Sequence, residues 1–535
     1  MDSTALQSIV PVAATPRPRR SQVMGGLQRL LGRVTLAGGE REAIDVIAPF
    51  TGTRIGWVPR GTPEDVQEAI RRARAAQPAW ARLSFRERGG IFLRFHDLLL
   101  VRQEEILDLI QLEAGKARRH AYEELADTAI VARHYAAHAA RYLRPRRRKG
   151  VFPLVTHAWE HHHPVGVVGF ISPWNYPLNL GITDAIAGLM AGNAAVLKPD
   201  HQTSFILLWA VDLLHEAGLP EDVVQVVTGF GPELGASLIE NVDFVMFTGS
   251  TRTGRLIGAQ AAERLIGCSL ELGGKNPMIV LEDADLDQAV EQGVRGSFVG
   301  AGQVCVSIER IYVQRPIFDR FVERFAERAR GLKLGAGFDY ETEMGSLASE
   351  RQLETVTEHV RDAVEQGARV LAGGHPRPEL GPFFYEPTVL VDVREGMKAF
   401  AEETFGPVVA IYPFDTVEEA VAKANDTPYG LSASLWTRDV ARGREIATRI
   451  QAGSVNLNDP YGAAWGSVAS PIGGFKASGE GRRHGAQGIL KYTEPQTVAA
   501  QRWVPLAPQP ILAPQRFFGA VTGVLKLLRR TPGLR

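Results

Sequence analysis

The sequence contains very little cysteine: Cys268 and Cys305 are the only two among 535 residues. Two thiols are too few for the disulfide framework of a secreted protein, so we expect a reducing, cytoplasmic compartment. The chain also has no apolar run near the roughly 18 residues of a membrane span, and its N-terminal region has no secretory apolar segment. These absences argue against a disulfide scaffold and a membrane-spanning protein.

The sequence also lacks net charge, because 60 Lys and Arg residues are balanced by 60 Asp and Glu residues. Nucleic-acid-binding domains usually carry an excess of positive charge, so no nucleic-acid partner is expected. Hydrophobic residues make up 45% and charged residues 22% of the chain, which excludes collagen-like and wholly disordered proteins. At about 150 residues per domain, the length predicts three or four domains.

The N-terminal part changes from irregular to helical sequence. Residues 1–20 combine proline with a basic cluster before any periodic pattern, so a loose arm is expected there. Further along, Thr62 with Asp65 and Ser84 with Glu87 match the capping pattern that starts helices. Helices are therefore predicted to begin at these two places.

From residue 165 onward, short apolar runs alternate with helical patterns. The expected strands span residues 165–171, 194–197, 223–227 and 244–247, and the expected helices span residues 178–190, 204–215 and 233–240. This alternation predicts an α/β fold with a parallel sheet, which binds ligands at the carboxyl ends of its strands. Further strands at residues 277–281, 310–313 and 408–412 predict a second α/β domain, which extends to about residue 458.

Cys305 is the first candidate for chemistry, because it follows a turn of small residues and lies outside any apolar periodic pattern. A thiolate is a strong nucleophile near neutral pH, and it needs a neighbouring positive or dipolar environment to form. A free cysteine can equally be buried as a small apolar side chain. The residue alone leaves both interpretations open.

Glu271 and Asn175 are two further candidates. Glu271 lies between two leucines at the end of a strand-like run, where burial would raise its pKa toward that of a general base. Asn175 lies between Pro173 and Pro177 in a stiff turn after a strand, where its amide could stabilise an oxyanion. The alternatives are a surface carboxylate and a turn asparagine that caps local backbone groups.

Seven motifs together resemble the NAD(P)-dependent aldehyde dehydrogenase superfamily, over residues 45–500 and in family order. They are Pro173-Trp174-Asn175-Tyr176-Pro177, Leu197-Lys198-Pro199, Phe247-Thr248-Gly249-Ser250-Thr251, Glu271-Leu272-Gly273-Gly274-Lys275, Gly302-Gln303-Val304-Cys305, Glu403-Thr404-Phe405-Gly406-Pro407 and Pro471-Ile472-Gly473-Gly474-Phe475-Lys476. The gap of 34 positions between Glu271 and Cys305 is also similar to that of the family.

The resemblance implies a domain plan. A Rossmann-like dinucleotide-binding domain would comprise residues 45–149 and 165–271, and a second α/β catalytic domain would comprise residues 272–484. Small β segments at residues 150–164 and 485–503 would mediate assembly into a homodimer or homotetramer. An arm over residues 1–44 and an amphipathic tail over residues 504–535 would complete the chain.

The resemblance also implies a mechanism. Cys305 would attack the carbonyl of a small-molecule aldehyde, and the Asn175 amide and the Cys305 backbone N–H would hold the oxyanion. The thiohemiacetal would pass a hydride to the nicotinamide. Glu271 would then activate water to hydrolyse the thioester.

Eight residues are expected around the cofactor, namely Trp174, Lys198, His201, Gly231, Gly249, Ser250, Glu403 and Phe405. By resemblance, Lys198 would reach the adenosine ribose, Glu403 would bind the nicotinamide ribose and Phe405 would flank the nicotinamide ring. Gly249 and Ser250 precede a helix start, which suits a pyrophosphate. The turn around Gly231 misses the usual G-x-G-x-x-G fingerprint because Gly235 comes one residue late.

His201 bears on the choice of cofactor. Relatives that prefer NAD often carry a Glu three residues after the lysine, and this carboxylate binds both ribose hydroxyls. His201 occupies that position here, so a 2′-phosphate is not repelled and NADP, or use of both cofactors, is favoured.

Within the superfamily, the chain most resembles bacterial NADP-dependent succinate-semialdehyde dehydrogenases. Four segments carry this resemblance: residues 306–313, 381–387, 464–467 and 481–485. Better-known enzymes of this activity hold the distal carboxylate with arginines, at positions that here read Val299, Gly300 and Asp184. Asp184 would repel an anionic substrate unless Arg295 or another cation compensates, so a broad aliphatic or aromatic aldehyde specificity stays open. A non-catalytic member of the same fold is a further alternative.

Three other features are interpreted as structural, and no metal site is expected. The histidines at residues 161–163 alternate faces in an extended segment and lack companion ligands. Asp283, Asp285 and Asp287 do not complete a calcium loop, so helix capping is expected there. Cys268 is expected to pack in the interior.

The C-terminal tail has an amphipathic pattern over residues 517–530, with basic residues nearby. Such a helix could lie on a membrane surface, dock on another subunit or form an unattached end. Because the stretch is short and its polar face is incomplete, membrane contact is not the favoured alternative.

Overall fold

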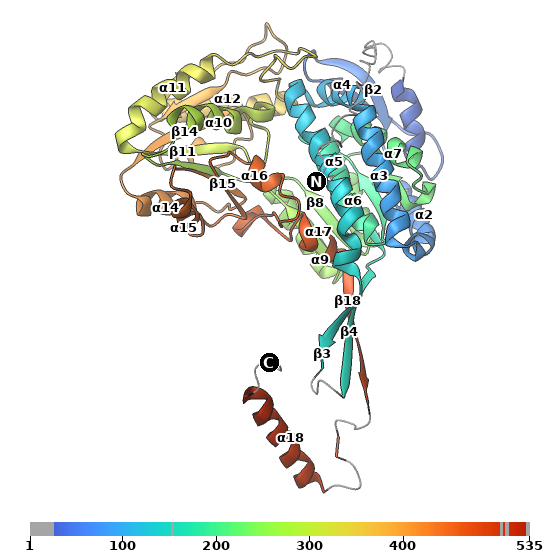
Figure 1. Ribbon diagram of the computed structural model, residues 1–535. Coiled ribbons are helices and arrows are strands. Elements are labelled where there is room, and N and C mark those ends of the chain that lie inside the picture. Colours follow the sequence, from blue (N-terminus) through green and yellow to red (C-terminus); the bar gives the residue numbers. More distant parts are fainter. Residues whose placement is uncertain (1–25, 151–154, 503–506, 509–512, 531–535) are drawn as a thin grey trace, which may run out of the picture.

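The computed structural model describes residues 26–150, 155–502, 507–508 and 513–530 (Figure 1). The loose arm expected over residues 1–20 lies outside these ranges. The helices are α2 (Pro63–Arg82), α3 (Phe85–Val101), α4 (Gln103–Ala114), α5 (Arg118–Leu143), α6 (Pro177–Met190), α7 (Ser204–Glu216), α8 (Gly231–Asn241), α9 (Thr251–Glu263), α10 (Leu286–Phe298), α11 (Phe318–Arg330), α12 (Glu350–Glu365), α13 (Lys398–Ala401), α14 (Val417–Asn425), α15 (Val440–Ala447), α16 (Gly462–Trp465), α17 (Gly485–Leu490) and α18 (Pro514–Arg530).

A six-stranded sheet forms the first α/β unit. Its strand order is β17-β9-β8-β5-β6-β7, with β5 (Val167–Ile171), β6 (Ala194–Lys198), β7 (Val224–Val226), β8 (Phe244–Thr248), β9 (Gly267–Glu271) and β17 (Gly479–Glu480). The five strands from β5 to β9 are parallel, and β17 is antiparallel to β9. The strand order reverses between β5 and β8, and such a switch point opens a crevice at the carboxyl ends of the strands.

Helices cover both faces of this sheet because its strands are apolar on both sides. Val168 and Phe170 of β5 pack into a core with helices α3 to α7, and Val167 of the same strand packs into a second core with α2, α8 and α9. Both expected capping boxes are present, at Thr62 with Asp65 and at Ser84 with Glu87. The α/β rhythm predicted from residue 165 onward is therefore confirmed.

A seven-stranded sheet forms the second α/β unit. Its order is β12-β13-β14-β11-β10-β15-β16, with β10 (Asn276–Val280), β11 (Ile308–Gln314), β12 (Arg369–Ala372), β13 (Thr388–Val391), β14 (Val408–Phe414), β15 (Ser432–Trp436) and β16 (Ser454–Leu457). All neighbouring strands are parallel except β12 and β13. Helices α10 to α12 pack on one face and α14 and α15 on the other.

Two smaller sheets complete the fold. β1 (Ala43–Ala48) and β2 (Thr53–Pro59) form an antiparallel pair. β18 (Thr493–Gln501), β4 (Thr156–Pro164) and β3 (Arg146–Lys149) form an antiparallel sheet that projects from the body, with α18 beyond it (Figure 1). In the part of the chain that the structure describes, no helix has the length and apolar character needed to cross a bilayer.

The structure differs from the predicted domain plan at two places. Leu27 and Leu30, in the segment expected to be an arm, are buried in the first core, and Val34 forms a bridge with Val226. β17 lies in the range predicted for the second domain but belongs to the first sheet, because it pairs with β9. Long-range pairing of this kind leaves no local sequence signal.

Candidate active site

The predicted catalytic residues gather where the two large sheets meet. Glu271 ends β9, and Asn175 follows β5, so both lie at the carboxyl edge of the first sheet. Cys305 precedes β11 and Glu403 precedes β14, so both lie at the amino edge of the second sheet. The candidate residues of the first sheet therefore face those of the second sheet across the boundary between the two sheets.

The loop before Cys305 has an unusual backbone. Gly300, Ala301 and Gly302 all have positive φ, at 57°, 57° and 73°. A Cβ at Gly302 would lie 2.0 Å from the backbone oxygen of Gly406, so only glycine fits there. This close approach seats the Cys305 loop directly against the loop that carries Phe405.

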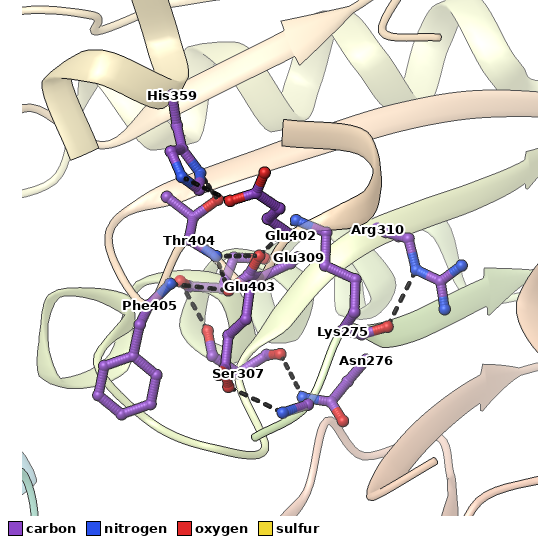
Figure 2. Close-up of polar contacts among 12 residues, drawn as sticks. Lys275, Asn276, Ser307, Glu309, Arg310, His359, Glu402, Glu403, Thr404 and Phe405 are labelled. Atoms are coloured by element: carbon purple, nitrogen blue, oxygen red, sulfur yellow. Dashed lines mark hydrogen bonds and ion pairs between the residues drawn. The ribbon is translucent and has the colours of Figure 1, made fainter. Parts of the chain in front are cut away.

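Buried polar contacts made by Lys275, Asn276 and Glu309 hold the Cys305 loop in place (Figure 2). Asn276 donates its side-chain amide to the backbone oxygens of Cys305 and Ser307, each at 2.8 Å. Lys275 and Glu309 form a buried ion pair at 2.6 Å, and Glu309 also accepts the backbone N–H groups of Thr404 and Phe405. These contacts tie β10, β11 and the loop before β14 into one rigid frame.

Asn175 is buried beside the turn that precedes Cys305. Its Nδ2 donates to the backbone oxygen of Gln303 at 2.9 Å. Gln303 is itself fixed, since its side chain bonds to Gly300 and Ala348. An amide nitrogen has two N–H groups, so this contact orients the group and leaves one donor.

Glu271 is buried at the sheet edge, with 7% of its surface exposed. Burial raises the pKa of Glu271 to about 7, opposed by the positive charges of Arg483 and Lys491. Its Oε1 has no hydrogen-bond partner among the described residues. A carboxylate with this environment can exchange protons near neutral pH.

From its sequence position, Asp184 is expected to repel an anionic substrate unless a cation compensates its charge. In the structure, Asp184 is buried among cations. It forms buried ion pairs with Arg483 at 2.5 Å and with Lys491 at 3.1 Å, and it accepts the Tyr492 hydroxyl at 3.2 Å. Its charge is therefore compensated, and not by Arg295. Lys491 also donates to Ser269 of β9, two residues before Glu271, so this ionic cluster lies close to the Glu271 carboxylate.

Cys305 itself is half-buried and packs beside apolar side chains. Burial raises the pKa of its thiol to about 12, and the negative charges of Glu271 and Glu403 add to that effect. The thiol is therefore protonated at neutral pH in this state. A positive charge placed near the sulfur would be needed to favour the thiolate.

The side chains around Cys305 form a mostly buried apolar cluster. Its members are Tyr176, Val299, Val304, Val306, Leu431 and Tyr461. The guanidinium of Arg295 lies 5.3 Å from the centre of the Tyr461 ring and pairs with Glu123 at 2.8 Å. Glu123 also accepts the Tyr461 hydroxyl at 3.0 Å.

Lys198 ends β6 and is buried. Burial lowers the pKa of its ammonium, and the negative charge of Asp200 opposes that effect. An ideal Cβ at Gly231 would lie 4.0 Å from its Nζ, so the glycine keeps the space beside the ammonium open. His201 pairs with Asp200 at 3.2 Å, and its ring lies 4.8 Å from that of Phe230.

The remaining expected cofactor residues follow β5 and β8 of the first sheet or precede β14 of the second. Ser250 caps α9 by accepting from the Thr253 N–H, and Gly249 precedes it at the end of β8. Trp174 and Phe405 are in edge-to-face contact at 5.6 Å. Glu403 accepts the Gly274 N–H at 2.8 Å, and burial raises its pKa to about 8.

The three features interpreted as structural have ordinary partners. His162 lies between Glu160 and Thr493 on β4, and within the described ranges no group of three His, Cys, Asp or Glu side chains forms a metal-binding cluster. Asp285 caps α10, as expected. Cys268 packs against the core that contains α8 and α9.

Sequence reasoning missed Lys275, Asn276 and Glu309 as parts of the site. Lys275 was quoted only as the end of a motif, although a buried lysine needs a partner carboxylate. Its partner Glu309 lies 34 positions later, on the neighbouring parallel strand, and this proximity follows only from the pairing of β10 with β11.

Comparison with known proteins agrees with this arrangement. A family model described as "Aldehyde dehydrogenase family" matches residues 36–498. A protein of Mycolicibacterium smegmatis, provisionally named succinate-semialdehyde dehydrogenase (NADP(+)), is 50% identical over 92% of this chain and 95% of its own length. A similarly named protein of Mycobacterium bovis is 45% identical over 96% of this chain and 99% of its own.

A solved structure gives the same result for the fold. The NAD+ complex of a Bacillus cereus aldehyde dehydrogenase superimposes with a TM-score of 0.84 at 35% identity, and covers 91% of this chain and all of that one. The family match spans far more than half of the chain, and the site has a half-buried thiol, a buried carboxylate and an oriented amide on facing edges. The chain belongs to the aldehyde dehydrogenase family of NAD(P)-dependent oxidoreductases.

Proposed function

We propose that the protein oxidises a semialdehyde, such as succinate semialdehyde, to the dicarboxylic acid with NADP, and that Cys305, Asn175 and Glu271 perform the chemistry. The observation that carries the proposal is that the facing edges of the two sheets bring three groups together. They are the Cys305 thiol, the Asn175 amide, which is hydrogen-bonded to the loop before Cys305, and the Glu271 carboxylate, whose pKa is near 7. The names of the two mycobacterial relatives support the substrate and cofactor.

The residues divide the reaction into two halves. The Cys305 thiol gives its proton to solvent water, and the sulfur bonds to the carbonyl carbon as the carbon–oxygen π bond opens. The new oxyanion accepts hydrogen bonds from the free N–H of Asn175 and from the Cys305 backbone N–H. When bound, the oxidised nicotinamide supplies the hydride acceptor that converts this adduct to a thioester. Glu271 then takes a proton from water, the hydroxyl bonds to the thioester carbon, and the carbon–sulfur bond breaks to release the acid.

The chain's residues fit a dinucleotide. Lys198 is a buried cation beside the space that Gly231 leaves open, so a ribose hydroxyl would fit next to its ammonium. His201 would lie near the adenosine ribose and, unlike a carboxylate, would not repel a 2′-phosphate. Ser250 and Gly249 would receive the pyrophosphate at the start of α9. Trp174, Gly231, Glu403 and Phe405 would line the rest.

Substrate selectivity would depend on Arg295, a partly exposed cation that lies against Tyr461 of the apolar cluster around Cys305. Replacing it in Arg295→Gln should raise KM for succinate semialdehyde about tenfold, because a charge-assisted hydrogen bond contributes about 1.5–3 kcal/mol. KM for hexanal should stay unchanged. Steady-state assays of both aldehydes, with NADP and with NAD, test this directly.

A matched control is Arg328→Gln on α11, which also removes ion pairs with glutamates, those with Glu291 and Glu343, outside the apolar cluster around Cys305. Equal catalytic efficiency of the parent enzyme with hexanal and with succinate semialdehyde would overturn the proposed substrate. It would favour the broad specificity that the apolar cluster around Cys305 also permits.

The hydrolytic half should depend on pH through Glu271. Because burial raises its pKa to about 7, we expect the thioester to be hydrolysed slowly when the carboxyl is protonated and faster once it ionises. The rate constant for deacylation should therefore rise from pH 6 to pH 8, with its midpoint near 7. A stopped-flow pH profile measures it. A midpoint near the ordinary glutamate value would contradict this environment for Glu271.

Asp184→Asn should move that midpoint to lower pH. Asp184 raises the pKa of Glu271, whereas Arg483 and Lys491 lower it, so loss of the anion leaves the two cations to favour the ionised form. The same change leaves two buried cations unpaired and should cost about 3–5 kcal/mol of folding free energy. Asp212→Asn, which breaks surface pairs with Arg29 and Arg33, should alter neither the profile nor the stability by a comparable amount.

The domain roles follow from the same proposal. The six-stranded sheet would bind the cofactor and the seven-stranded sheet would carry Cys305. Among the described strands, β3, β4 and β18 form a sheet of their own, and its exposed Trp159 and Val498 suit an interface with another subunit in a dimer or tetramer. The two reduced cysteines fit a cytoplasmic enzyme.

A further inference from the structure

α18 leaves large apolar side chains uncovered. Phe518, Leu525 and Leu527 are exposed by 56%, 52% and 64% of their surfaces. No residue of the helix is classed as buried. In Figure 1 the helix lies beyond the sheet of β3, β4 and β18, far from both large sheets. An exposed apolar helix face usually marks a surface that binds something.

The helix separates apolar from polar residues completely. At 3.6 residues per turn, one continuous arc of about 180° is apolar. Its members are Phe517, Phe518, Ala520, Val521, Val524, Leu525, Leu527 and Leu528. The opposite arc contains all of the charged and amide side chains together with Thr522 and two glycines. Over residues 517–530, the range expected from the sequence, the polar face is incomplete. In the structure the helix begins at Pro514, so Gln515 and Arg516 also belong to the polar arc and complete it.

The charge of the helix is one-sided. It carries Arg516, Lys526, Arg529 and Arg530, and it contains no aspartate or glutamate. The whole chain, in contrast, has equal numbers of acidic and basic residues. A subunit interface would require only the apolar arc. Cations that flank an apolar half, without any anion among them, complement an anionic bilayer, where the apolar half inserts and the cations meet lipid phosphates.

We propose that α18 binds parallel to the surface of an anionic lipid bilayer, with its apolar arc inserted at the level of the headgroups. At 17 residues and with polar side chains on half of its surface, the helix lies on the membrane and does not cross it. The projecting sheet of β3, β4 and β18 lies between α18 and the two large sheets, so the catalytic unit would stay away from the bilayer (Figure 1).

Sedimentation with sucrose-loaded vesicles tests the proposal on the full chain. We expect binding on the order of 100-fold tighter to mixed phosphatidylglycerol and phosphatidylcholine than to phosphatidylcholine alone, and weaker binding as salt is added. A chain that ends at Gln501 should stay in the supernatant. The unfolding temperature of each variant reports whether the catalytic unit is intact.

Two double variants separate the contributions. Phe518→Ser with Leu525→Ser removes apolar area at constant charge and should abolish binding, whereas Gln515→Ser with Thr522→Ser, on the polar arc, should bind as the parent does. Lys526→Gln with Arg530→Gln should weaken binding to the anionic vesicles about 30-fold, at roughly 1 kcal/mol per cation.

Several results would overturn the proposal. One is a full chain that remains in the supernatant with anionic vesicles at low salt. Another is equal binding by the chain that ends at Gln501. A third is an oligomer that dissociates in the Phe518→Ser, Leu525→Ser variant while no protein binds vesicles, which would assign the apolar arc to a second copy of this chain.

Discussion

Glu271→Gln should limit the enzyme to a single rapid turnover per active site. The amide cannot take a proton from water, so hydrolysis of the thioester should slow about 10²–10⁴-fold. Acylation should persist, because Glu271 is one of the charges that raise the pKa of Cys305, and its removal does not hinder ionisation of the thiol. A burst of reduced cofactor, equal to the active-site concentration and followed by a very slow phase, is the expected absorbance trace.

Glu480→Gln provides the control for this result. Glu480 is an exposed carboxylate on β17, opposite Leu270 in β9, so it is close to Glu271 in the sheet but lies at its surface. This variant should turn over at the parental rate. Loss of both the burst and the steady state in Glu271→Gln would contradict a role limited to hydrolysis, and mass spectrometry of the acylated Cys305 would show directly which half has stopped.

Asn175→Ala should lower kcat about 10²–10³-fold, the usual cost of removing one oxyanion donor. The lost amide also releases the Gln303 carbonyl, so displacement of the Cys305 loop must be distinguished from loss of the donor. The rate of alkylation of Cys305 by iodoacetamide provides that distinction. It should change little, because alkylation forms no oxyanion.

Asn456→Ala is the matched control for Asn175→Ala. Asn456 is also buried and donates its amide to a backbone oxygen, that of Ala433 at 3.3 Å, but it lies on β16 away from the thiol. Its removal should lower stability without selective loss of kcat. If the two variants had equal kcat values, Asn175 would be a structural residue only.

The parts of this fold that short-range signals determine were predictable. Thr62 and Asp65 lie three residues apart, so the capping box that starts α2 is visible in the local sequence, although Asp65 also accepts hydrogen bonds from Arg41 and the Ala37 N–H. Apolar periodicity likewise located β5, β6, β7 and β8 of the first sheet to within two residues. The structure of residues 26–30 was not predictable in this way, because the burial of Leu27 and Leu30 depends on helices that follow much later.

The candidate site shows the same limit. Cys305, Glu271 and Asn175 were found from motifs, but the environment that tunes them comes from residues distant in the chain. Arg483 lies 299 positions after Asp184, and no spacing rule joins them. Asp184 was expected to oppose an anionic substrate because its partner could not be seen. The left-handed backbone of Ala301 was equally hidden, since alanine rarely adopts it.

The pairing of β17 with β9 constrains how molecules enter and leave. Gly479 and Glu480 hydrogen-bond along Glu271 and Leu270, and the Leu272 N–H donates to the Ser478 oxygen at 3.0 Å. The segment that follows the second sheet is thus hydrogen-bonded to β9 at the edge of the first sheet, beside the buried Glu271 carboxylate. A hinge motion that separates the two sheets would break these backbone hydrogen bonds. We therefore expect the nucleotide to enter and leave through rearrangement of loops and side chains, while the two sheets keep their relative position.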